Sequence, residues 1–181
     1  MASSLEKLKE EGRVAVHWRS YELRPAGSRL PPEYRERILS ARPRLYAIAR
    51  ERYGIEIHEG PFGINSRPAL TGAKYAESQG KGDSYHMAVF RAYWRQALSI
   101  DKREVLARIA EDIGLDAGSF LAALDDKWLE AEVLADQEEA YAHGLTGVPA
   151  LVFLRKYLVM GAQPYAVLKE IVERIESGEA G

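Results

Sequence analysis

The 181-residue sequence contains no cysteine. Disulfide bonds, thiolate nucleophiles and cysteine-ligated metal sites are therefore excluded for these residues. The sequence also has no apolar run near the roughly 20 residues that a membrane-spanning helix needs. Its first segment, Met1–Gly12, is charged and amphipathic, whereas a secretory signal has an apolar stretch. We therefore expect a cytoplasmic protein.

An excess of charge of either sign is absent as well, because the formal net charge is -2 and the isoelectric point is near 6.1. Binding to a nucleic-acid backbone usually needs a basic surface, so nucleic acid is not an expected partner. The histidines occur in separate segments without the short spacing of metal ligands, and we expect no metal site. They are His17, His58, His86 and His143.

Apolar residues make up 46% of the sequence and charged residues 29%, which is ordinary for a globular protein. The length fits one domain. Near the start, Arg13–Leu23 alternates Val14, Val16 and Trp18 with more polar residues, a pattern that predicts a strand. Ser3 or Ser4 is expected to cap a short helix before it, rather than to act as a nucleophile.

The middle of the sequence has apolar stripes at helical spacing, each bounded by a cap or stop residue. A proline at position 43 is expected to kink or split the first of these helices. The predicted helices are Glu33–Tyr53, Pro68–Gln79, three further helices capped by Asp83, Asp101 and Asp116, and Lys127–His143.

The C-terminal part begins with a proline directly before a short apolar strand, Ala150–Leu154. Proline donates no hydrogen bond to a sheet, so it belongs at strand starts or edges, and an X-Pro bond can be cis at modest cost. Tyr157–Met160 is expected to pair with this strand as a hairpin. The turn between them lacks the glycine or asparagine usual in two-residue loops, which indicates a longer loop or a strained residue. An amphipathic helix with apolar residues from Val167 to Ile175 follows.

The motif Thr146-Gly147-Val148-Pro149 resembles the cis-proline loop of thioredoxin-fold proteins. It is most similar to the DsbA-like branch that includes the 2-hydroxychromene-2-carboxylate isomerases. The resemblance implies an α/β thioredoxin-like fold, a single domain over 1–181, with a helical insertion at approximately 33–138. The other segments that carry the resemblance are Glu6–Lys9, Trp18–Leu23, Ala73–Ala76, Gly80–Lys81, Phe90–Tyr93, Gly114–Asp116, and the tail from Gly144 through Val159 to Gly161–Pro164, which is the most specific part.

The sequence departs from this family at its start. Members begin with a strand, followed by a Cys-x-x-Cys turn, or a serine-containing turn in the isomerase-like relatives, and then a helix. The present sequence starts inside what matches that helix, so Ser3 and Ser4 are not equated with catalytic residues. In the resembling fold the first strand lies between the segments around Val16 and Val152. We expect a partner strand or swapped dimer to complete the sheet, or a start site assigned downstream of the natural one.

The resemblance implies a thiol-disulfide oxidoreductase that acts on extended peptides or protein thiols. Because the cysteines are absent, we expect no disulfide exchange from these residues, and we assign no catalytic residue. Whether the chain is an enzyme stays open. One alternative is a non-catalytic module that binds a peptide or partner. The other is a glutathione-dependent isomerase or transferase, the one case in which a cofactor is expected.

The same resemblance supplies the candidate binding residues. The loop residues Thr146, Gly147, Val148 and Pro149 would contact substrate, with Val148 at the peptide-contacting position. Asn65 and Ser66 match a polar segment that lies near the active cleft of the isomerase-like relatives. Ordinary turn chemistry explains asparagine and serine there equally well.

Overall fold

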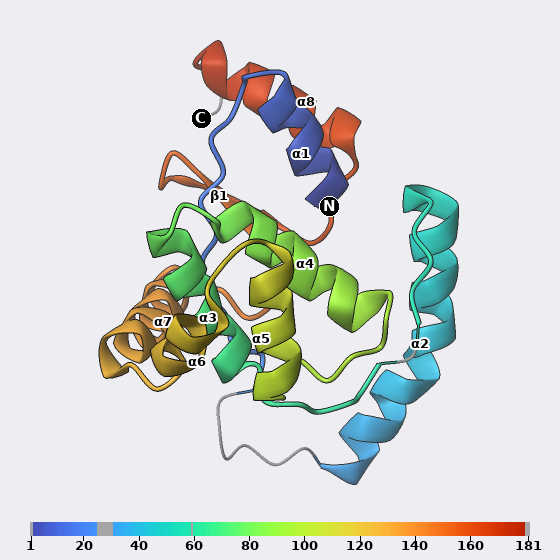
Figure 1. Cartoon of the computed structure of the whole chain (residues 1–181). Coiled ribbons are helices and arrows are strands. Elements are labelled where there is room, and N and C mark those ends of the chain that lie inside the picture. Colours follow the sequence, from blue (N-terminus) through green and yellow to red (C-terminus); the bar gives the residue numbers. More distant parts are fainter. Residues whose placement is uncertain (1, 25–30, 59, 180–181) are drawn as a thin grey trace. The chain divides into compact units, whose positions relative to one another are not determined.

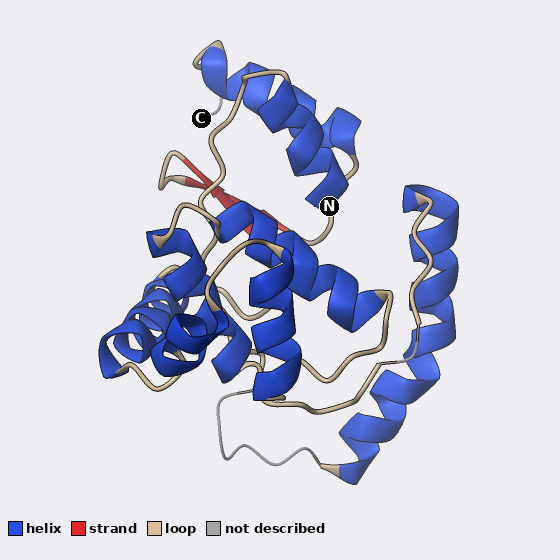
Figure 2. Ribbon diagram, viewed as in Figure 1, coloured by secondary structure: helices blue, strands red, loops and turns tan. Residues whose placement is uncertain are grey.

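Helices dominate the part of the chain that the computed structural model describes, residues 2–24, 31–58 and 60–179 (Figures 1 and 2). The chain divides into two compact units: unit 1 comprises Met1–Leu23 and Glu138–Gly181, and unit 2 comprises Arg24–Gln137. The helices are α1 (Ala2–Glu10), α2 (Pro32–Tyr53), α3 (Arg67–Ser78), α4 (Gly82–Trp94), α5 (Arg103–Asp112), α6 (Ala117–Ala123), α7 (Lys127–Ala142) and α8 (Tyr165–Glu176); the strands are β1 (Ala150–Phe153) and β2 (Tyr157–Met160).

The core of unit 1 lies between α1 and α8, which pack against each other. Leu8 and Leu168 are completely buried there, with Leu5 and Val172 beside them. Removal of these side chains from water is the main favourable term for this unit. This burial also explains why α1 is stable. A helix of nine residues is too short to persist alone in water, and α1 is held in place by the packing of its apolar face.

The predicted strand Arg13–Leu23 is wrong, since the structure has no strand there. The alternation behind that prediction is nevertheless real: Val14, Val16 and Trp18 pack against the unit 1 core, while the residues between them are exposed. A side-chain period of two gives an extended strand only when a neighbouring strand supplies backbone hydrogen bonds. In the described residues the sheet contains β1 and β2 alone.

The expected hairpin is present, with β1 and β2 antiparallel from Ala150 opposite Met160 to Phe153 opposite Tyr157. Its turn is longer than two residues and spans Leu154 to Lys156. Leu154 and Arg155 both have positive φ, 51° and 58°, which non-glycine residues seldom adopt. The two alternatives expected for a turn without glycine or asparagine, a longer loop or a strained residue, are therefore both present.

Unit 2 is a helical assembly in which α3 contacts α4, α5 and α6. Its core is built around Tyr85, Leu106 and Phe120, each with an exposed fraction of 0%. Gly72 of α3 lets this core close, because a Cβ at that position would lie 2.5 Å from the Tyr85 hydroxyl and 2.6 Å from Cζ of Phe120.

One of the three aspartates predicted to cap helices of unit 2 does so, and the other two do not. Asp116 is the N-cap of α6 and accepts a hydrogen bond from the Ser119 N–H at 2.8 Å, as predicted. Asp83 lies inside α4, and α5 is preceded by Lys102 rather than Asp101. The Asp101 carboxylate instead accepts a hydrogen bond from the Ser99 hydroxyl, so local side-chain bonding replaced the cap.

Helix α2 runs through Pro43 without being split, and its axis bends near the middle (Figure 1). A proline inside a helix removes one backbone hydrogen bond and kinks the axis. Of the two outcomes expected for Pro43, the structure therefore shows the kink and not the split. Within the described residues, no helix has the length and apolar character needed to cross a membrane.

Candidate functional site

The loop after α7 in unit 1 contains four of the predicted binding residues. Gly144 has a φ of 70° and ends α7, and the Leu145 N–H donates back to the Ala140 carbonyl at 3.0 Å, an arrangement that satisfies the helix end. The Val148–Pro149 peptide bond is cis. The loop then enters β1 at Ala150.

Two hydrogen bonds hold the ends of this loop. The Tyr21 hydroxyl donates to the Leu145 carbonyl at 3.4 Å, and the Gly161 N–H donates to the Pro149 carbonyl at 2.8 Å. Between these anchors, Thr146 and Val148 are exposed, Val148 by 49%. The loop therefore presents three residues from a fixed frame.

The peptide groups of Thr146, Gly147 and Val148 form no hydrogen bond among the described residues. Space is open at the middle position, because a Cβ added to Gly147 would have no atom within 4 Å. Free backbone donors and acceptors beside open space are what an extended peptide needs in order to bind through its main chain.

Asn65 and Ser66 lie in unit 2, at the start of α3. The Asn65 side-chain oxygen accepts a hydrogen bond from the Arg67 N–H at 3.0 Å, a local turn that fixes the first residue of the helix. Ser66 is the N-cap residue but makes no capping hydrogen bond with its side chain. The residues predicted from the sequence therefore belong to two different units. Thr146–Pro149 lies in unit 1, and Asn65 and Ser66 lie in unit 2.

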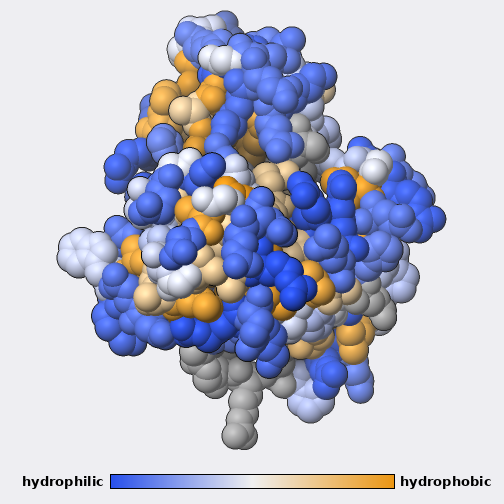
Figure 3. Space-filling view, viewed as in Figure 1, coloured by the Kyte–Doolittle hydropathy of each residue, from blue (hydrophilic) through white to orange (hydrophobic). Residues whose placement is uncertain are grey.

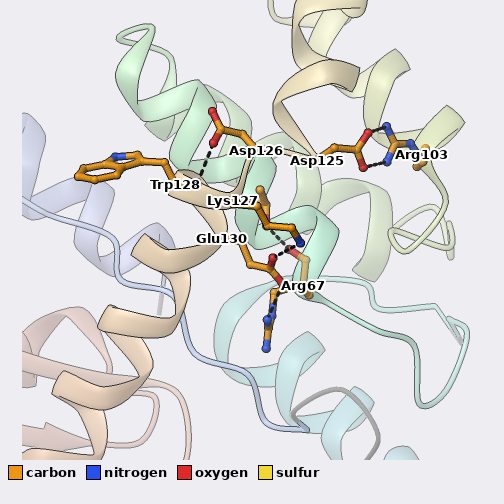
Figure 4. A network of polar contacts seen from close by, with 8 residues as sticks. Arg67, Arg103, Asp125, Asp126, Lys127, Trp128 and Glu130 are labelled. Atoms are coloured by element: carbon orange, nitrogen blue, oxygen red, sulfur yellow. Dashed lines mark hydrogen bonds and ion pairs between the residues drawn. The ribbon is translucent and has the colours of Figure 1, made fainter.

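A polar pocket of about 270 Å³ adjoins Asn65. Arg67 donates to one oxygen of Glu130 at 3.0 Å, and Lys127 donates to the other oxygen at 2.8 Å (Figure 4). Asp125, on the same pocket, receives two hydrogen bonds from Arg103, at 2.7 and 2.9 Å. Charges of both signs line this pocket and neutralise one another.

These contacts shift the pKa values of the carboxyl groups. The hydrogen bond from Lys127, followed by that from Arg67, lowers the pKa of Glu130. The hydrogen bond from Arg103 lowers the pKa of Asp125. Both groups are consequently held as carboxylates, a state that suits ion pairing and not the donation of a proton.

Only part of this pocket could be predicted from the sequence. Lys127 and Glu130 are three residues apart on one helix, a spacing that signals a contact. Arg67 is 63 residues from Glu130, and a single sequence carries no signal for a contact at that separation. The acidic pair at 125 and 126 does not form a shared carboxylate site, because the Asp126 carboxylate accepts from the Trp128 N–H at 2.8 Å instead.

The remaining candidates lie elsewhere. Ser4 lies within α1, not at its cap, and its buried hydroxyl donates to the Gln163 carbonyl at 3.4 Å. His86 packs against Phe90 with 4.2 Å between ring centroids, and burial lowers its pKa to about 4. No three His, Asp or Glu side chains of the described residues are grouped so that they could hold a metal ion.

Comparison with known proteins found similar proteins over most of this chain. A family model described as "DSBA-like thioredoxin domain" matches residues 1–173. YwbO of Bacillus subtilis (strain 168) is 27% identical over 173 residues, which are 92% of this chain and 82% of YwbO.

Solved structures agree. The probable DsbA oxidoreductase SCO1869 of Streptomyces coelicolor has a TM-score of 0.80 and 27% identity, with 99% of this chain and 82% of that one covered. A 2-hydroxychromene-2-carboxylate isomerase has a TM-score of 0.80 and 21% identity, with 99% of this chain and 90% of that one covered. The second likeness shows a shared fold alone.

Proposed function

This chain belongs to the family of DSBA-like thioredoxin domains, and from that membership we propose that it binds an extended polypeptide segment without exchanging disulfides itself. The chain has the thioredoxin-like fold of that family, rich in helices and with a small two-stranded sheet in the described residues. The proposed binding surface is the loop Thr146–Val148 together with the hairpin that follows it.

One observation carries the non-redox half of this proposal: the 181 residues contain no cysteine. Thiol-disulfide exchange requires a thiolate that attacks a disulfide sulfur and leaves a mixed disulfide on the protein. No other side chain replaces it in that reaction. The residues that hold a polypeptide can persist without the residues that react with it.

The main-chain groups of the loop support the binding half. Thr146, Gly147 and Val148 offer peptide N–H and carbonyl groups that are not used within the described structure. The two hydrogen bonds at Leu145 and Pro149 hold the loop in place, which reduces the entropy lost on binding. A peptide bound in this way is recognised through its backbone, with little dependence on its sequence.

The hairpin supplies apolar surface beside the loop. Val152 and Leu158 are opposite each other in the sheet and are exposed by 41% and 44%, and Met160 on the same face is exposed by 43%. Cross-strand neighbours on one face are close enough to form a continuous surface. We therefore expect the preferred segment to be extended and to carry apolar side chains.

The experiment uses a polypeptide that is permanently unfolded and has no reactive thiol, such as fluorescein-labelled, reduced and carboxymethylated α-lactalbumin. Fluorescence anisotropy should show saturable binding to the full chain, unchanged by dithiothreitol. Gly147→Leu should weaken binding at least tenfold, because the added side chain occupies the space above the loop. Ala166→Leu is the matched control, since it adds the same side chain at an exposed position of α8.

The proposal fails if the probe does not bind, or if both leucine variants bind it equally well. Acceleration of insulin reduction by dithiothreitol above the blank would overturn the non-redox half. Calorimetry with glutathione tests the isomerase-like alternative. Saturable glutathione binding together with no binding of the unfolded probe would favour that alternative over the proposed function.

A further inference from the structure

Three arginine side chains of unit 2 surround one phenyl ring. The guanidinium carbons of Arg24, Arg42 and Arg35 lie 4.9, 5.4 and 5.8 Å from the centroid of Phe62. Any two of these carbons are separated by less than the sum of their distances to the ring. That limit is comparable with the Debye length of about 10 Å at 0.1 M ionic strength, so the three charges act on one another.

None of the three arginines forms an ion pair with a carboxylate among the described residues. This distinguishes them from Arg67 and Arg103, which are paired with acidic side chains. Arg24 and Arg42 are also half-buried rather than fully solvated. Positive charges that are gathered and partly removed from water, without a counter-charge, cost free energy.

Arg42 lies on the less exposed face of α2, so the grouping of the arginines is not confined to freely exposed side chains. Five of the six positions of α2 that are not exposed recur at spacings of four, four, three and four, which is one helical face; they are Ile38, Arg42, Tyr46, Ala49 and Tyr53, with Ile48 beside them. Arg42 is therefore on the face that α2 turns toward the rest of unit 2. The surface over α2 is otherwise mainly hydrophilic in the view of Figure 3.

Tyr93 lies close enough to the same cluster to interact with two of its charges. The Tyr93 hydroxyl donates to the carbonyl of Pro61, the residue before Phe62, at 2.9 Å. Burial raises the pKa of Tyr93, while Arg42 and Arg24 act in the opposite direction. The two guanidinium groups thus bear on the same phenol, and the hydrogen bond ties the Phe62 segment to α4.

The ring alone does not account for the cluster. A cation over a phenyl face is attracted weakly at an exposed site. Repulsion between each pair of guanidinium groups opposes that attraction. An anion bound among the three groups would compensate for this repulsion. Each guanidinium offers a planar fork of N–H donors that matches a phosphate or carboxylate edge.

We propose that Arg24, Arg35 and Arg42 around Phe62 form a binding site for a doubly charged oxyanion of the phosphate monoester class. A phosphate monoester carries a charge of about -1.5 to -2 at pH 7 and three acceptor oxygens, one for each arginine. A single carboxylate would leave most of the positive charge uncompensated. This site lies in unit 2, so it does not depend on the proposed peptide-binding loop of unit 1.

The test is a titration of the ¹⁵N-labelled full chain, at constant ionic strength, with inorganic phosphate and separately with phenyl phosphate. Amide resonances of Phe62, Gly63 and Arg42 should shift and saturate. The double variant Arg24→Gln/Arg42→Gln should raise the Kd at least tenfold. The matched control is Arg44→Gln/Arg52→Gln, which removes the same net charge from exposed positions of α2 and should change the Kd less than twofold.

Linear shifts without saturation would overturn the proposal, as would equal Kd values for the two double variants or equally tight binding of acetate. If the glutamine variant does not fold, Arg24→Lys/Arg42→Lys keeps the charge and removes the planar fork, and it should weaken phosphate binding severalfold. Equal affinities for phosphate and phenyl phosphate assign recognition to the phosphate group alone. Tighter binding of phenyl phosphate assigns part of it to an aromatic substituent.

Discussion

The ammonium group of Lys74 lies 2.6 Å from a carboxylate oxygen of Asp136, and both side chains are more than nine-tenths buried. The pair joins α3 to α7 within unit 2. Removing two charges from water is expensive, and their attraction repays the cost only while both are present. This pair therefore specifies how the two helices meet more than it adds net stability.

The first prediction concerns this pair. Lys74→Met should lower the free energy of unfolding by about 3 to 5 kcal/mol, because it removes the ammonium group that is paired with a buried carboxylate. Lys74→Met/Asp136→Leu should cost less than the lysine change alone. Urea denaturation measures both values. Lys127→Met is the control: Lys127 is 88% exposed in its pair with Glu130, and its loss should cost less than about 1 kcal/mol.

The second prediction concerns Gly72. Gly72→Ala should destabilise the chain by about 1 to 3 kcal/mol, because the new methyl group would overlap the Tyr85 hydroxyl and the Phe120 ring. The comparison is Gly118→Ala in α6, where the nearest atom is 3.4 Å from the added Cβ. That change should be neutral or stabilising, since alanine favours helices over glycine. Equal losses of stability at the two positions would argue against close packing at Gly72.

The third prediction contrasts two tyrosines. The hydroxyl of Tyr85 is buried and has no hydrogen-bond partner among the described residues. Tyr85→Phe should therefore raise the free energy of unfolding, by about 1 kcal/mol. Tyr93→Phe should lower it by about 1 kcal/mol, because the Tyr93 hydroxyl donates to the Pro61 carbonyl. A loss of stability in both variants would show that Tyr85 has a partner such as a buried water.

Local sequence was enough to predict most helices and the hairpin. Asp116 caps α6 because its carboxylate reaches the third backbone N–H, an interaction within four residues. The apolar spacing of α8 likewise predicts a helix whose inner face, Leu168 and Val172, is buried. Features that depend on contacts within one or two helical turns can be predicted from a single sequence.

Features decided by distant partners were not predictable in the same way. The segment Arg13–Leu23 alternates like a strand but has no ladder in the structure, because pairing depends on a neighbour that local sequence does not specify. At the candidate site, the loop Thr146–Pro149 was identified from its motif. The contact of Arg67 with Glu130 and the grouping of arginines around Phe62 depend on the tertiary fold and had no local signal.

The fourth prediction is a dependence of stability on pH through His86. Burial lowers its pKa to about 4, against 6.5 for an unperturbed histidine, and Asp83 only partly opposes this. As the pH falls below about 6.5, His86 takes up a proton in the unfolded chain. In the folded chain His86 stays neutral until the pH is about 4. The unfolded state binds more protons in that window, so stability falls as the pH falls through it. The loss is of the order of 3 kcal/mol at about 1.4 kcal/mol per pKa unit.

Urea denaturation at intervals from pH 7 to pH 4 measures this effect. His86→Leu removes the titrating group, so its unfolding free energy should decline less steeply than that of the unchanged chain over this window. His143→Gln, at an exposed position after α7, is the control and should keep the steep decline. Acidic side chains also titrate near pH 4, but they are common to all three proteins and cancel in the comparison. Parallel profiles for His86→Leu and the unchanged chain would mean that His86 takes up its proton equally well in the folded state.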